Sequence, residues 1–188
     1  MSQRIIIFDS PDGTGKTNIA QGLAEQLEIP YFKFNREHDY WRKGQFKTAL
    51  EFDQPYLLQL LQQTRQSIII DRAYPAEWVY SQVFGRETNE PLIKELDRAY
   101  AELGAWIIVP LRDSYQGNRQ DEVVPQDKLT QLHDMYDVFA DWTECNVLRI
   151  YVDTFGNDLI RELDAIMPVL DIRGDHRAKH DIILRSHL

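Results

Sequence analysis

Residues 4–20 of the chain read Arg-Ile-Ile-Ile-Phe-Asp-Ser-Pro-Asp-Gly-Thr-Gly-Lys-Thr-Asn-Ile-Ala. The β-branched run from Ile5 to Phe8 predicts a buried strand, and the residues from Lys16 onward predict a helix. The turn between them carries two glycines, which let backbone N–H groups converge on phosphate oxygens without a clash from Cβ atoms. A strand, a glycine-containing turn and a helix in this order are typical of a phosphate-binding loop.

The residue types in this loop suit ATP and Mg²⁺. The helix N-terminus offers unpaired N–H donors and a partial positive charge to a phosphate. Lys16 is placed to reach the β- and γ-phosphates, and the Thr17 hydroxyl is placed to ligate Mg²⁺. We therefore predict that ATP is bound by the consecutive residues Asp12, Gly13, Thr14, Gly15, Lys16 and Thr17.

The loop departs from the pattern G-x-x-x-x-G-K-[ST] at its first position, where Ser10 stands in place of glycine. Ser10 precedes Pro11, and a residue before proline favours extended geometry. A small residue without positive φ therefore fits there, and we read residues 9–16 as a P-loop rather than an ordinary glycine-rich turn.

The composition of the chain limits the number of domains, the kinds of partner and the cellular compartment that we expect. The chain has 188 residues, 43% of them apolar, which suits one domain with a full core. A net charge of −9 disfavours binding to nucleic acid or to an anionic membrane. The single cysteine, Cys145, leaves no internal disulfide, and we predict that it is a small core residue in a protein of the reducing cytosol. We expect no transmembrane helix and no signal peptide, because apolar runs are short and the first strand begins almost at once.

Periodicity along the chain predicts alternating strands and helices. Strands are expected at residues 4–9, 31–34, 67–71, 105–111 and 146–152. Helices are expected at residues 16–27, 75–84, 92–103, 126–142 and 159–167, and one more ends near residue 64. Such alternation indicates an α/β fold with a five-stranded, mainly parallel sheet and helices on both faces. We assign residues 1–167 to the domain, about 112–124 to a lid, and 168–188 to a charged, solvated or partner-packed tail.

A second chemical element, Asp71-Arg72, stands at the end of the strand at 67–71. Ligands of parallel α/β sheets bind at the carboxyl ends of the strands, and the P-loop and this element share that position. Arg72 offers a planar fork suited to a monophosphate, and Asp71 is placed to orient a nucleophile or to hold Mg²⁺ through water. The alternative is a structural Asp–Arg pair at the strand end.

These residues resemble a known family. Ile-Phe-Asp-Ser-Pro-Asp-Gly-Thr-Gly-Lys-Thr, residues 7–17, resembles the F-E-G-P-D-G-S-G-K-T opening of thymidylate kinases, and Asp71-Arg72 matches their D-R-Y/H element. Tyr80 stands at a tyrosine of that family, and Arg36-Glu37 at its Arg-Glu pair. The resemblance covers about residues 3–167. It implies a P-loop kinase with ATP and Mg²⁺ as cofactors, a nucleotide substrate and a homodimeric state.

The resemblance also implies roles for single residues. Asp12 would contact the deoxyribose 3′-hydroxyl, and Arg72 and Arg36 would bind the acceptor phosphate. A basic residue must bridge the transferring phosphoryl group, and residues 11–14 offer none, so we expect it from the lid, with Arg119 preferred over Arg112. The aromatic residues expected to stack on the base are Phe52 and Tyr80.

Other positions depart from the family. Ala73, Val79 and Ser81 replace its usual residues, and the stretch from residue 121 through Trp142 looks like that of deoxynucleoside kinases. Such departures are typical of a divergent member, for example a viral one acting in the host cytoplasm. We expect transfer of the γ-phosphoryl group of ATP to a deoxynucleoside monophosphate, with dTMP leading. The alternatives are a deoxynucleoside kinase acting on the 5′-hydroxyl and a nucleotide-binding protein without catalysis.

Overall fold

A computed structural model describes residues 3–33, 49–115, 124–155, 158–171 and 179–185. Within these ranges, one parallel sheet has the strand order β2-β3-β1-β4-β5-β6. The bounds are β1 (Ile5–Phe8), β2 (Tyr31–Lys33), β3 (Ile68–Asp71), β4 (Trp106–Leu111), β5 (Asn146–Tyr151) and β6 (Asp181–Leu184).

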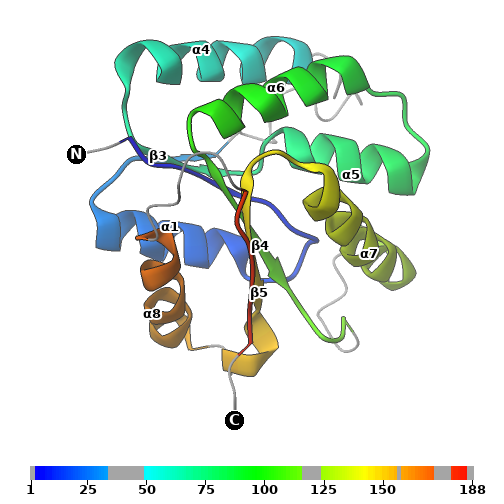
Figure 1. Ribbon diagram of the computed structural model, residues 1–188. Coiled ribbons are helices and arrows are strands. Elements are labelled where there is room, and N and C mark those ends of the chain that lie inside the picture. The colour runs from blue at the N-terminus through cyan, green and yellow to red at the C-terminus, as the bar shows by residue number, and fades with distance from the viewer. Residues whose placement is uncertain (1–2, 34–48, 116–123, 156–157, 172–178, 186–188) are drawn as a thin grey trace.

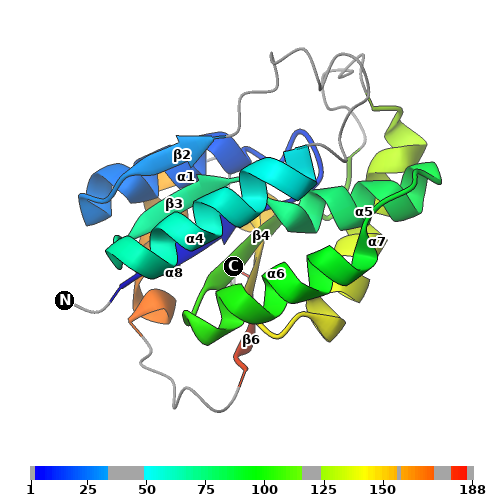
Figure 2. The ribbon, with the colours of Figure 1, turned by 90° about the horizontal axis from the view of Figure 1, so that it is seen from above.

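Helices cover both faces of the sheet, as predicted (Figures 1 and 2). One face carries α1 (Lys16–Leu27) and α8 (Leu159–Leu170). The other face carries α4 (Gln54–Thr64), α5 (Tyr74–Phe84), α6 (Glu90–Glu102) and α7 (Gln126–Trp142). Two short helical segments, η1 (Ala49–Asp53) and η2 (Val152–Phe155), precede α4 and follow β5. No helix in the described ranges is both long and apolar enough to cross a membrane.

The central strand β1 is buried on both faces because its apolar residues alternate between two clusters. Ile5 and Ile7 belong to the cluster under α4–α7, whereas Ile6 and Phe8 belong to the cluster under α1 and α8. A side-chain period of two residues produces this division. Each fully buried side chain of this kind contributes about 2 kcal/mol relative to an exposed one, so the isoleucine runs fix the sheet.

The prediction of five strands is wrong, because the sheet has six. Strand β6 comes from the segment predicted as a charged tail, and it pairs with β5 from Val147↔Asp181 to Ile150↔Leu184. Its Asp-Ile-Ile-Leu sequence is only half-buried in alternation, as expected for an edge strand. Four such residues next to many charges give too weak a pattern to indicate a strand from the sequence.

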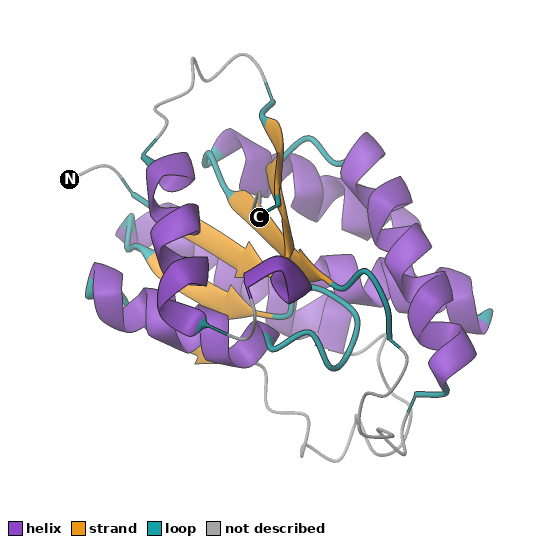
Figure 3. Cartoon of the chain, turned by 90° about the horizontal axis from the view of Figure 1, so that it is seen from below, coloured by secondary structure: helices purple, strands orange, loops and turns teal. Residues whose placement is uncertain are grey.

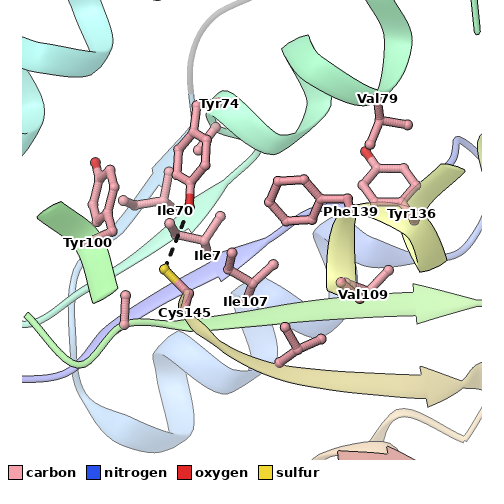
Figure 4. Packing of buried hydrophobic residues seen from close by; sticks show 14 of the residues in the cluster. Ile7, Ile70, Tyr74, Val79, Tyr100, Ile107, Val109, Tyr136, Phe139 and Cys145 are labelled. Atoms are coloured by element: carbon pink, nitrogen blue, oxygen red, sulfur yellow. Dashed lines mark hydrogen bonds between the residues drawn. The ribbon is translucent and has the colours of Figure 1, made fainter. Parts of the chain in front are cut away.

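The core under α5, α6 and α7 holds a group of aromatic residues (Figure 4). The ring of Tyr74 stacks on that of Tyr100, with centroids 5.7 Å apart, and lies 6.2 Å from that of Phe139. Cys145 is fully buried beside them, as predicted, and its Sγ lies 3.6 Å from the Tyr74 hydroxyl. Burial raises the pKa of the Cys145 thiol, so this cysteine is a packing residue.

All strands run in parallel, so their carboxyl ends lie at one edge of the sheet, where the arrowheads of Figure 3 point. Phe8 of β1 pairs with Asp71 of β3 in the register, and the backbone N–H of Arg72 donates to the Phe8 carbonyl at 2.9 Å. The P-loop and the Asp71-Arg72 element therefore meet at this edge.

Candidate functional site

The P-loop, residues 9–16, turns through two left-handed glycines. Gly13 has a φ of 81° and Gly15, which caps α1, has a φ of 77°. A Cβ atom at Gly15 would meet nothing within 4 Å, so the backbone conformation rather than space requires glycine there. Ser10 needs no positive φ, as predicted, and its Oγ lies 2.7 Å from Thr14 Oγ1, which closes the loop internally.

Asp71 connects the loop to β3. Lys16 Nζ donates to its Oδ1 at 2.6 Å, and the hydroxyls of Thr17 and Tyr31 donate to its Oδ2 at 2.7 and 2.8 Å. Lys33 Nζ also lies 3.0 Å from Oδ2. Burial alone would raise the pKa of Asp71, but the Lys16 charge and these hydrogen bonds hold it well below its usual value. Asp71 is therefore ionised.

Lys16 is itself buried, with 7% exposed. Burial and the nearby Arg72 charge lower the pKa of the Lys16 ammonium to about 8, although Asp71 opposes this shift. A buried ammonium with a neighbouring guanidinium is stabilised by anions, which is the property required of a phosphate-binding site.

Thr17 and Asp71 are suitable ligands for Mg²⁺. Thr17 Oγ1 and Asp71 Oδ2 lie 2.7 Å apart. Two oxygens on adjacent corners of an Mg²⁺ octahedron, with bonds of about 2.1 Å, lie about 3.0 Å apart. In the described residues no group of three or more His, Cys, Asp or Glu side chains could hold a metal. The other ligands of an Mg²⁺ ion would thus be water and phosphate oxygens, which is its usual environment beside a nucleotide.

Arg72 belongs to a second group, with Asp12 of the loop and Tyr80 of α5. Its guanidinium donates to Asp12 Oδ1 and lies 5.2 Å from the centroid of the Tyr80 ring. The Tyr80 hydroxyl donates to Asp12 Oδ2 at 3.1 Å. The structure thus brings together three predicted substrate-binding residues from three separate segments, and Arg72 is only 8% exposed.

Asp9 is a residue of this site that the sequence analysis did not select. It is fully buried, and its Oδ2 accepts hydrogen bonds from the backbone N–H groups of Ala73 at 3.2 Å and Ala76 at 2.9 Å. Its Oδ1 accepts from the Tyr136 hydroxyl at 2.6 Å. Asp9 therefore caps α5 and fixes the turn that carries Arg72. The available signal was the same as for Asp71, a carboxylate directly after a buried strand.

Arg112, the second choice for the lid arginine, holds a structural pair. Its Nε donates to the Gly13 carbonyl at 2.8 Å, and its Nη1 donates to Asp153 Oδ1 at 2.9 Å. Arg112 therefore supports the P-loop from the end of β4.

Of the three remaining predicted residues, the structure describes Phe52. Phe52 lies in η1 and is 69% exposed, so it is not a core residue. Arg36 and Arg119 lie outside the described residues.

A cavity of about 620 Å³ lies beside Arg112, between the end of β4 and the start of α7. Three of its lining residues are Asp113, Asp127 and Asp134. Carboxylates repel a polyphosphate, so the phosphates are better placed at the P-loop than in this cavity.

No family model matches the chain, and no curated protein matches its sequence. Solved structures do match its fold. The YorR protein from Bacillus subtilis, in complex with phosphorylated GDP, aligns with a TM-score of 0.66 and 16% identity over 94% of this chain and 99% of that one. Thymidylate kinase from Ehrlichia chaffeensis aligns with a TM-score of 0.60 and 17% identity over 91% of this chain and 100% of that one. Deoxyadenosine kinase from M. mycoides, with dCMP and dCDP bound, aligns with a TM-score of 0.56 and 18% identity over 89% of this chain and 98% of that one. The chain therefore has the fold of P-loop kinases that act on nucleosides and nucleotides.

Proposed function

We propose that the protein transfers the γ-phosphoryl group of ATP, with Mg²⁺, to a deoxynucleoside monophosphate, and that dTMP is the leading acceptor. The observation that carries this proposal is the pair of buried cations at one sheet edge, Lys16 and Arg72. Their charges are close enough for Arg72 to lower the pKa of Lys16. Two phosphate groups, one from the donor and one from the acceptor, would satisfy both cations.

On the donor side, the N–H groups of the P-loop and Lys16 would hold the β- and γ-phosphates. Thr17 and Asp71 would hold Mg²⁺, which supplies neutralisation of the phosphate charge when bound. Lys16 would exchange its contact with Asp71 for the phosphates. Because Thr17 and Tyr31 also donate to Asp71, the carboxylate keeps partners after this exchange.

On the acceptor side, Arg72 would bind the monophosphate through its planar fork, and Asp12 would accept a hydrogen bond from the 3′-hydroxyl. Tyr80 is placed by its contacts with both residues to border the acceptor. Phosphate binding by Arg36, base stacking by Phe52 and a charge-neutralising role for Arg119 remain predictions. Alignment of the two phosphates would then supply most of the catalysis, since phosphoryl transfer depends on positioning and electrostatics.

A second candidate is a deoxynucleoside kinase that acts on the 5′-hydroxyl. The contact between Arg72 and Asp12 favours it, because a guanidinium already neutralised by a carboxylate suits an uncharged acceptor. The likeness to a deoxyadenosine kinase concerns the fold and is compatible with both candidates.

An assay of ADP release with MgATP separates these functions. The purified protein is offered each common deoxynucleoside and each deoxynucleoside monophosphate at equal concentration. Our proposal predicts turnover with dTMP and little with thymidine. Turnover with thymidine and not with dTMP would identify the second candidate, and ATP binding without turnover on any acceptor would identify a non-catalytic nucleotide-binding protein.

A further inference from the structure

Lys33, the last residue of β2, lies at the place where Mg²⁺ would bind. Its Nζ donates to Thr17 Oγ1 at 3.0 Å and lies 3.0 Å from Asp71 Oδ2. These two oxygens are the ones that fit the metal. Lys16 differs, because its Nζ contacts Oδ1, the other oxygen of the carboxylate.

The sheet register places Lys33 there. In the parallel pairing of β2 with β3, Lys33 is opposite Asp71, and Tyr31, two residues earlier, reaches the same Asp71 Oδ2. The side chain of Lys33 is 40% exposed, whereas that of Lys16 is 8% exposed. The Lys33 ammonium is already partly hydrated and can therefore swing out into solvent, whereas the buried Lys16 ammonium cannot.

We propose that Lys33 is a tethered cation that occupies the Thr17–Asp71 oxygen pair until Mg²⁺ displaces it, and that it thereby sets the Mg²⁺ concentration at which ATP binds tightly. This inference rests on the proposed function. An ammonium 3.0 Å from both oxygens excludes an ion that needs contacts of about 2.1 Å to them. Two cations at one oxygen pair also repel each other, so binding of Mg²⁺ requires Lys33 to move.

The contacts of Lys33 indicate what it does at the Thr17–Asp71 oxygen pair when no Mg²⁺ is bound. Without metal, Asp71 is a buried carboxylate whose negative charge Lys16 compensates at Oδ1, whereas Oδ2, besides its contact with Lys33, accepts hydrogen bonds from the neutral hydroxyls of Thr17 and Tyr31. Lys33 compensates part of this charge and contacts both oxygens, whose direct hydrogen bond of 2.7 Å is close to the spacing that the metal requires. The cost is competition with Mg²⁺, which a variant without the ammonium would remove.

The test measures ATP affinity by titration calorimetry over a series of Mg²⁺ concentrations, beginning with EDTA. The variants are Lys33→Met, which removes the ammonium, and Lys33→Arg, which keeps a charge. Lys94→Met is the matched control, because Lys94 is exposed on α6. We expect the Mg²⁺ concentration for half-maximal ATP affinity to fall about fivefold or more in Lys33→Met, because a close competing charge is gone. It should stay near the wild-type value in Lys33→Arg and Lys94→Met.

An unchanged or higher half-maximal Mg²⁺ concentration in Lys33→Met would overturn the inference. Weaker ATP binding in EDTA, with the Mg²⁺ midpoint unchanged, would also overturn it and would identify Lys33 as a phosphate ligand. A wild-type protein that binds no ATP at any Mg²⁺ concentration would instead contradict the proposed function itself.

Discussion

Asp71 and Arg72 are consecutive residues whose side chains serve different partners. Asp71 contacts Lys16 and Thr17, and Arg72 contacts Asp12. The left-handed backbone of Arg72, with a φ of 70°, points its side chain away from that of Asp71. This conformation costs a residue with a Cβ atom about 1 kcal/mol or more. Hydrogen bonds offset that cost: the N–H of Arg72 donates to the Phe8 carbonyl, and the N–H of Ala73 donates to the Asp9 carboxylate.

The role of Arg72 can be tested by Arg72→Lys, which keeps the charge and loses the fork. We expect the acceptor-side kcat/KM to fall about 10-fold or more, because an ammonium cannot make the bidentate contact. The KM for ATP should change little. The measurement is steady-state kinetics with each substrate varied in turn, and a defect confined to the ATP side would contradict the assigned role.

The sequence could predict the loop residues and Asp71-Arg72, because their chemistry depends on local spacing. It could not predict their partners. The contact of Arg72 with Asp12 joins residues that are 60 positions apart, and Lys33 reaches Asp71 only through the strand register. Asp9 carried a usable signal, a carboxylate directly after a buried strand, but the P-loop pattern begins one residue later, at Ser10.

At the scale of elements, Asp9 links β1 to α5. Ala73 at the N-cap position of α5 has no side-chain acceptor, so the Asp9 carboxylate, directly after β1, caps a helix that begins 65 residues later. The Tyr136 hydroxyl ties α7 to the same carboxylate. One side chain therefore fixes two helices relative to the P-loop.

Replacement of this residue by alanine, Asp9→Ala, should destabilise the protein by about 2–4 kcal/mol, because the buried N–H and hydroxyl donors lose their acceptor. Urea unfolding measures the change. Asp164→Ala is the matched control, since Asp164 is exposed on α8 and should shift stability by about 0.5 kcal/mol or less. Equal effects of the two variants would show that Asp9 does not anchor α5.

Asp97 plays a similar part on α6. Its carboxylate accepts from the hydroxyls of Tyr74 and Thr143 and from the Glu144 N–H, and it is 2% exposed. Burial raises its pKa above 3.8, although these hydrogen bonds oppose the shift. Since the unfolded chain ionises first, the contribution of Asp97 to stability falls as pH rises from about 3.8 through the raised pKa.

The side chain of Asp97→Asn cannot titrate. As pH rises through that window, the unfolding free energy of the variant should therefore increase relative to that of the wild type, and above the window the difference should stay constant. Urea unfolding at several pH values from 4 to 8 measures the difference. The raised pKa at Asp97 would be contradicted if the difference in unfolding free energy between variant and wild type did not depend on pH. It would also be contradicted if the wild type gained stability relative to the variant as pH rises.

The elements themselves were largely predictable. The bounds of α1 and α7 agree with the sequence periodicity, because an apolar face marks each of them. Helix α8 was predicted to end at Met167 and instead continues through Pro168 to Leu170. A proline in the last turn removes one hydrogen bond, and burial of Val169 and Leu170 compensates for it.

At the scale of the molecule, parallel topology brings the chemistry together. Asp9 and Asp12 follow β1, Asp71 and Arg72 lie at the end of β3, and the two pairs meet because these parallel strands end at one edge. The buried basic residues of the described part, Lys16 and Arg72, lie at this edge in a chain of net charge −9. A small phosphorylated acceptor is therefore favoured over a polyanion such as nucleic acid.

The resemblance to thymidylate kinases also predicts a homodimer. Tyr56 and Leu60, four residues apart on α4, are 71% and 45% exposed and offer an apolar contact surface. Light scattering after size exclusion should give twice the 22.1 kDa mass of one chain. A mass of 22.1 kDa across micromolar concentrations would show a monomer.

The central claim, phosphoryl transfer at the P-loop, is tested most directly by Lys16→Met. The measurement is dTDP formation from MgATP and dTMP, with thermal unfolding as the check on folding. We predict that kcat falls about 100-fold or more, a loss of about 2.7 kcal/mol in transition-state stabilisation, because the cation that follows the γ-phosphoryl charge is gone. The melting temperature should stay close to that of the wild type, since Asp71 keeps its contacts with Thr17, Tyr31 and Lys33. Turnover of a folded Lys16→Met protein at the wild-type rate would contradict the account.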